Sequence, residues 1–164
     1  MNDSNFLHMK SPLGNLILRA NDSFLLSCEF ENKNTPDLRQ AQFNSKDHKM
    51  GPSFLILKSA HQQLQEYFQK KRKHFELPLL LQGTSFQKKV WELLLQIPYG
   101  ETQSYSELAR SLNSKAFQAT GAALGKNPLP LFYPCHRVVG KDGSLTGYSG
   151  GLKAKKILLM LEKF

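Results

Sequence analysis

Two adjacent side chains, Cys135 and His136, have the chemistry of a nucleophile and its base. A thiolate is the strongest common nucleophile in proteins, and imidazole is its usual activator. Neighbours in an extended chain point to opposite sides, so direct contact is not guaranteed and a turn or a water could link them. The histidine also needs a third group to orient it, and Glu162 on the final amphipathic segment is a candidate. An isolated Cys-His pair is more often structural than catalytic, so its surroundings decide.

The segments that flank this pair are suited to a flat ligand. Asn127 and Pro128 end a helical segment upstream, and residues 140–152 downstream are rich in glycine. Glycines let backbone amides approach a ligand closely. Tyr148 and Ser149 lie in this stretch and could hold a heterocycle by its polar edge.

Two capping boxes predict where helices begin in the second half of the chain. Thr84 to Gln87 opens a helix that Pro98 to Gly100 ends, and Ser104 to Glu107 opens a short one through about Ser111. The first helix turns its apolar face inward through Phe86, Val90, Leu93, Leu94 and Ile97, with Trp91 at the border of that face.

A tight turn at residues 112–114 leads to a third helix, from Lys115 to about Lys126. Two short helices around a brief turn indicate a helix-turn-helix, although such pairs are also common in plain helical cores. Small side chains dominate the third helix, which lets it approach either a neighbouring helix or a narrow minor groove closely.

The first half predicts a sheet followed by a helix. Short strands at 6–10, 16–20 and 24–30 are separated by turn residues and read as an antiparallel meander. A polar connection at 31–52 precedes a helix that begins near Ser53, whose apolar stripe is Phe54, Leu57, His61, Leu64 and Phe68. The basic run at 70–73 closes that helix, and residues 75–81 are a candidate strand.

Composition narrows the class of protein. The 164 residues carry a formal charge of +9, which suits either a polyanionic partner or an ordinary basic surface. Residues 83–164 hold 11 basic and 5 acidic side chains and are the better candidate for nucleic-acid contact. Two cysteines form no disulfide framework or metal spacing, and Cys28 reads as a buried thiol. With no signal peptide or run of ~18 apolar residues, we expect a cytoplasmic protein, nucleoid-associated if bacterial.

The segment Pro134-Cys135-His136-Arg137-Val138 closely resembles the active-site signature of the O6-alkylguanine-DNA alkyltransferases, also called methylated-DNA–protein-cysteine methyltransferases. Further stretches resemble this family's C-terminal domain, in its order: Gly83–Gln87, Ile97–Thr102, Ser104–Tyr105, Gly121–Leu124, Asn127–Pro128, Gly143–Leu152 and Glu162. The resemblance implies an α+β fold, with a small N-terminal antiparallel-sheet (RNase H-like) lobe at 1–82. Residues 83–164 would form the helical DNA-binding domain, with a helix-turn-helix and the active-site cysteine.

The resemblance implies single-turnover repair of DNA, in which the alkyl group of O6-alkylguanine moves to Cys135 after the base is flipped out of the duplex. O4-alkylthymine is a second candidate substrate. His136 would take the thiol proton through a water and Glu162 would orient His136. Asn127 would brace the turn, and Tyr105 would help protonate the leaving guanine. The base pocket would be lined by Leu124, Val138, Tyr148 and Ser149.

Contacts to double-stranded DNA would come from the third helix, lying in the minor groove, and from one residue beside the cysteine. These residues are Lys115, Gln118, Ala119, Gly121, Ala122, Lys126 and Arg137. Gln118 stands where the family usually carries an arginine that fills the space of the flipped base, and glutamine lacks its charge and planar fork. No match to the zinc site of some relatives is seen.

The thioether product is stable in water, so one molecule acts once, without a cofactor, as a monomer that could assemble cooperatively on DNA. Three other functions remain open from the residues. A lesion-binding relative without transfer would lack the reactive cysteine. A cysteine hydrolase would turn over esters or peptides, and a transcription regulator would leave the Cys135 segment without a purpose.

Overall fold

The computed structural model describes residues 5–32, 51–112 and 117–163. They form an α+β fold of two compact units, residues 1–80 and 81–164. Each unit has its own core and is described by itself. Among the described residues, no helix is long and apolar enough to cross a membrane.

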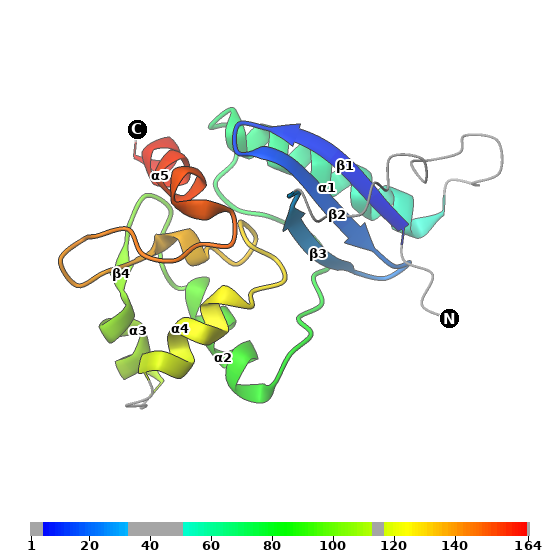
Figure 1. The fold of residues 1–164 in the computed structure, drawn as a ribbon. Helices are drawn as coiled ribbons and strands as arrows, with labels where there is room; N and C mark the ends of the chain where they lie inside the picture. The colour runs from blue at the N-terminus through cyan, green and yellow to red at the C-terminus, as the bar shows by residue number, and fades with distance from the viewer. Residues whose placement is uncertain (1–4, 33–50, 113–116, 164) are drawn as a thin grey trace. The chain divides into compact units, whose positions relative to one another are not determined.

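The N-terminal unit is built on the predicted meander (Figure 1). β1 (Asn5–Ser11), β2 (Gly14–Ala20) and β3 (Leu25–Phe30) pair antiparallel in the order β1-β2-β3. Leu18 of β2 lies opposite Leu7 and Cys28. Cys28 is buried, and burial raises the pKa of its thiol, which is typical of an inert core cysteine.

Helix α1 (Pro52–Phe68) packs against all three strands of this sheet. It ends before the basic run, because Lys70 has a left-handed φ of 60° and the N–H groups of Lys70 and Lys71 bond back to Tyr67 and Glu66. The predicted stripe is confirmed at Leu57 and Leu64, which are fully buried, whereas Phe54, His61 and Phe68 are half-buried. Tyr67, which was not predicted, completes the buried face.

The candidate strand at 75–81 is also wrong. Leu79 forms only an isolated parallel bridge with Leu25, and the Pro78 carbonyl accepts from Leu25. Proline has no N–H to extend a ladder, which explains why the pairing stops. The predicted connection at 31–52 lies mostly outside the described residues.

The C-terminal unit begins with α2 (Ser85–Leu94), and its predicted capping box at Thr84 and Gln87 is confirmed. Trp91 does not border the apolar face but lies in the core, 1% exposed. Its Nε1 donates to the carbonyl oxygen of Ala123 at 2.8 Å. The indole therefore ties α2 to α4 (Phe117–Gly125).

The predicted helix pair is confirmed as α3 (Tyr105–Ser111) and α4, which pack against each other. Ser104 and Glu107 form the second capping box. Lys115, the predicted start of the third helix, lies outside the described residues.

A short parallel pairing positions the cysteine segment. β4 (Gln103–Ser104) pairs with β5 (Val138–Val139). Tyr105 directly follows β4, and the 3-10 turn η2 (Cys135–Arg137) directly precedes β5. α5 (Gly151–Glu162) completes the unit and contacts η2.

Candidate active site

Cys135 lies at the wall of a pocket of about 250 Å³ in the C-terminal unit. Its lining residues come from α3, α4, η2 and the glycine-rich loop: Tyr105, Gly121, Leu124, Gly125, Cys135, Gly147, Tyr148 and Ser149. The structure therefore brings together the predicted nucleophile and most of the predicted base-pocket residues. Val138 is fully buried in β5 and is not among the lining residues.

The cysteine is protonated at rest. Cys135 is 6% exposed, and burial raises the pKa of its thiol to about 11. A hydrogen bond with the Asn127 side chain and the charge of Lys155 oppose this rise. A thiolate would therefore form only when a base removes the proton.

The turn that carries the cysteine is held by Asn127. Its Nδ2 donates to the Tyr133 carbonyl at 2.8 Å, and its Oδ1 accepts from the Leu129 N–H at 3.0 Å. Leu131, within this turn, has a φ of 79°, a conformation that costs a leucine about 1–3 kcal/mol. The bracing role predicted for Asn127 thus has a geometric basis in these two bonds.

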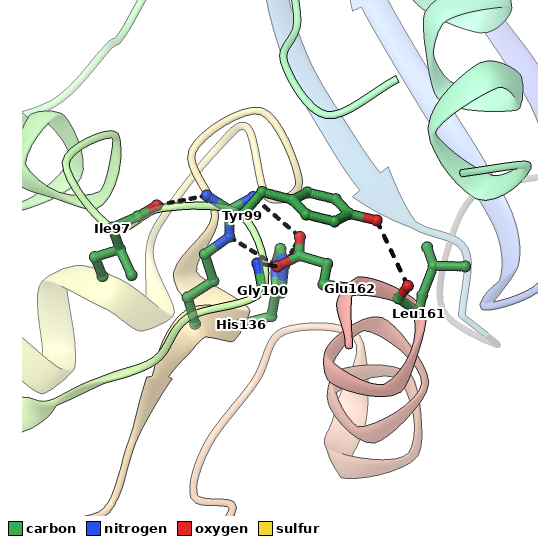
Figure 2. Close-up of polar contacts among 7 residues, drawn as sticks. Ile97, Tyr99, Gly100, His136, Leu161 and Glu162 are labelled. Carbon is green, nitrogen blue, oxygen red and sulfur yellow. Dashed lines mark hydrogen bonds and ion pairs between the residues drawn. The ribbon is translucent and has the colours of Figure 1, made fainter. Parts of the chain in front are cut away.

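His136 is buried and faces Glu162 at the end of α5. Its Nε2 lies 2.8 Å from Glu162 Oε1, and both side chains are almost fully buried (Figure 2). Burial lowers the pKa of His136, and the hydrogen bond to Glu162 opposes this. The imidazole is therefore neutral near pH 7 and able to accept a proton, while its Nδ1 bonds to no part of the chain that the structure describes.

Arg137, which was expected to contact DNA, is buried and bonded within the unit. It is 8% exposed, and its Nε and Nη2 donate to the two Glu162 oxygens at 2.9 and 3.0 Å. Its Nη1 donates to the Ile97 carbonyl at 2.7 Å. Such a bidentate pair uses the guanidinium fork to hold a carboxylate, and each of the three nitrogens already donates one bond within the unit.

The chain approaches Glu162 closely at Gly100 as well. The Gly100 N–H donates to Glu162 Oε2 at 3.2 Å, and Gly100 has a φ of 83° (Figure 2). A Cβ at this position would lie 2.9 Å from the Glu162 carbonyl oxygen. The turn after α2, the cysteine segment and the end of α5 therefore meet at one carboxylate.

Lys155 is a site residue that the sequence reasoning missed. It is fully buried, and its Nζ donates to the carbonyls of Thr146 and Gly147 at 2.7 and 3.3 Å. The Tyr105 hydroxyl donates to the same Thr146 carbonyl at 2.9 Å, and Lys155 Nζ lies 5.7 Å from the Tyr105 ring centre. Its signal was its place on the buried stripe of α5, seven residues before Glu162.

Apart from Phe117, the exposed side chains of α4 are small or polar. Gln118, Ala119 and Ala122 are exposed, as is Lys126 just after the helix, and Gly121 is half-buried at the pocket. None of the described residues form a group of three His, Cys, Asp or Glu side chains that could hold a metal ion.

Two family models match the chain. Residues 85–164 match the 6-O-methylguanine DNA methyltransferase DNA binding domain, and residues 7–81 match the ribonuclease-like domain of the same family. A constitutive methylated-DNA–protein-cysteine methyltransferase of Bacillus subtilis is 43% identical, over 94% of this chain and 92% of its own length. The chain belongs to the 6-O-methylguanine DNA methyltransferase family.

Other relatives support this membership in the 6-O-methylguanine DNA methyltransferase family. The methylated-DNA–protein-cysteine methyltransferase of Methanosarcina barkeri is 39% identical over 94% of each chain. The solved structure of the Mycobacterium tuberculosis O6-methylguanine methyltransferase has a TM-score of 0.82, at 37% identity, and covers 98% of this chain and 93% of that one. The Mycobacterium tuberculosis protein in complex with DNA has a TM-score of 0.81 at 36% identity, over 96% and 92%. The predicted α+β class and its ribonuclease-like N-terminal lobe are thereby confirmed.

Proposed function

We propose that this protein repairs DNA directly, by moving the alkyl group from O6 of guanine to the Sγ of Cys135 in a single turnover. The observation that carries the assignment is a buried thiol on a pocket wall, next to a neutral His136 paired with Glu162, in a chain of this family. Family membership supports a methylated-DNA–protein-cysteine methyltransferase activity and DNA as the partner.

The transfer is a displacement at the alkyl carbon. The thiol proton passes to His136 Nδ1 through a water, the sulfur–carbon bond forms, and the carbon–oxygen bond to guanine breaks. The guanine leaves with the electron pair and takes a proton from the Tyr105 hydroxyl, which already lies at the pocket wall. Because water does not cleave the thioether, the thiol is not regenerated, and the step needs no cofactor.

The pocket supports a flipped-out base. A thiol that is 6% exposed cannot reach a base inside a stacked duplex, so the base must leave the stack. Tyr148 and Ser149 would line the polar edge of the base and Leu124 its apolar side. Val138 would contribute through its backbone carbonyl. We also propose O4-alkylthymine as a second substrate, which would occupy the same pocket.

We assign residues 1–82 to the N-terminal lobe and residues 83–164 to the domain that binds DNA and reacts. Helix α4 would lie in the minor groove, with Gln118, Ala119, Gly121 and Ala122 towards the duplex. Lys126 would lie near phosphate. We propose the same role for Lys115, which lies outside the described residues. We expect a monomer, able to assemble cooperatively on DNA, in the cytoplasm or on a nucleoid.

Mass spectrometry tests the assignment. After incubation with duplex DNA carrying O6-methylguanine, one methyl group is expected on the peptide that contains Cys135. Cys28→Ser is the matched control and should react like the wild type, because Cys28 is buried in the other unit. Cys135→Ser should abolish transfer and keep lesion binding. No adduct, or an adduct on Cys28 alone, would refute the proposal.

A further inference from the structure

Phe117 is a large apolar side chain that remains 50% exposed at the start of α4. Other exposed large apolar residues in the described part of this unit are Leu95, Leu152 and Met160, which lie at the end of α2 or on α5. Among these residues, Phe117 alone lies on a helix that lines the Cys135 pocket. Its ring is therefore accessible from solvent on the helix that helps to form the pocket.

Helical spacing places Phe117 beside the pocket. Residues three, four and seven positions apart share one side of a helix, so Phe117 lies on the same side as Gly121 and Leu124, which line the pocket. At a rise of about 1.5 Å per residue, Phe117 is roughly 6 Å from Gly121 along the axis. Phe117 is therefore the first residue of α4, on the helix side that faces the pocket and one turn before Gly121.

A base that enters this pocket leaves a gap in the duplex beside α4. Unstacking costs a few kcal/mol per base step, and inserted apolar side chains such as phenylalanine recover part of that cost by stacking. The exposed neighbour Gln118 is polar and uncharged. It is suited to hydrogen bonding with the unpaired base, whereas it lacks a ring that could stack.

We propose that Phe117 enters the base stack and fills the space that the lesion vacates, with Gln118 beside it. This inference rests on the proposed function, since it assumes that a base is flipped towards Cys135. It assigns Phe117 as a positioning residue, because the ring would act on the duplex and not on the reacting atoms.

Single-turnover rates of Phe117→Ala on two substrates test this role. The substrates are an O6-methylguanine duplex and the single-stranded oligonucleotide of the same sequence. In the single strand, the lesion does not have to be flipped out of a duplex. We expect about a tenfold slower transfer from the duplex, and less than about a twofold change on the single strand. Leu152→Ala is the matched control, because Leu152 is also 50% exposed but lies on α5. It should change neither rate.

Two further variants complete the test. Phe117→Trp keeps an aromatic plane and should restore the duplex rate, whereas Phe117→Gln keeps an unbranched helix former without a ring and should repeat the duplex-selective loss. An unchanged duplex rate would overturn the proposal. Equal slowing on both substrates would also overturn it, because that result would show that Phe117 supports the packing of the domain and does not act on the duplex. If the wild type methylates Cys135 in neither substrate, the proposed function itself fails.

Discussion

Cys135 and His136 are adjacent in the chain but are tuned by different neighbours. Burial raises the pKa of the thiol, whereas burial lowers the pKa of the imidazole. Both shifts favour the neutral forms, so the resting pair is a thiol and a neutral imidazole. The proposed transfer would then use a proton relay and not a standing population of thiolate.

This pair predicts the pH dependence of transfer. Below the lowered pKa of His136, which lies under its ordinary value of about 6.5, the imidazole is protonated and cannot accept the thiol proton. We expect the single-turnover rate to fall on the acid side and to be flat from about pH 7 to 9.

A mechanism through free thiolate would behave differently. With a thiol pKa of about 11, the thiolate fraction and the rate would rise about tenfold per pH unit between roughly pH 7 and 9. Such a rise would contradict the relay. Lesion binding by Cys135→Ser over the same pH range is the control, because it separates chemistry from DNA affinity.

At the scale of elements, three chain segments meet at Glu162. Arg137 holds the carboxylate from the cysteine segment, and Gly100 holds it from the turn after α2. Removing one partner of a buried ion pair typically costs about 3–5 kcal/mol, so these contacts join positioning of His136 to stability of the unit. Stability and reactivity are therefore expected to change together here.

The Gly100 contact can be isolated with a pair of glycine substitutions. Gly143 has a φ of 81°, close to the 83° of Gly100, but a Cβ there would meet nothing within 4 Å. Gly143→Ala should cost about 1–2 kcal/mol of unfolding free energy, from backbone conformation alone. Gly100→Ala should cost more and slow transfer by roughly 10–100-fold, because the added methyl displaces the end of α5.

Chemical denaturation and single-turnover kinetics of both variants measure these effects. Equal stability and equal rates for the two alanine variants would show that the approach of Gly100 to Glu162 does not position the histidine.

At the scale of the whole molecule, the formal charge of +9 overstates the number of cations that are available to contact DNA phosphates. Arg137 and Lys155 are buried and bonded to a carboxylate and to carbonyl groups. Exposed cations such as Lys126 remain available to phosphate. The salt dependence of binding should therefore report a subset of the basic residues.

Lys126→Gln tests which unit meets the phosphates. Each phosphate contact contributes about 0.9 to the slope of log K against log salt concentration, so this variant should lower the slope by about 0.9. Lys71→Gln, an exposed lysine of the N-terminal unit, is the control and should leave the slope unchanged. Fluorescence anisotropy titrations at several salt concentrations would give both slopes, and the reverse pattern would place the duplex on the other unit.

Local signals were sufficient for much of this protein. The meander, the two capping boxes and the helix pair follow from turn residues, caps and apolar periodicity, which act over a few positions. The family was identified by the resemblance of the cysteine segment together with further stretches of residues 83–164, since the Cys135-His136 pair alone is more often structural. The strand predicted at 75–81 failed at Pro78, since a missing N–H overrides the apolar pattern.

Only the tertiary structure decided how distant charges are used. Arg137 was predicted on DNA and Lys155 was overlooked, because their partners Glu162 and Thr146 lie 25 and 9 residues away. A sequence shows that a side chain is charged, whereas burial and pairing depend on which segments pack together. The chain's own residues thus determined that Cys135 could react, and the packing of α5 against the cysteine segment decided which groups prepare it to do so.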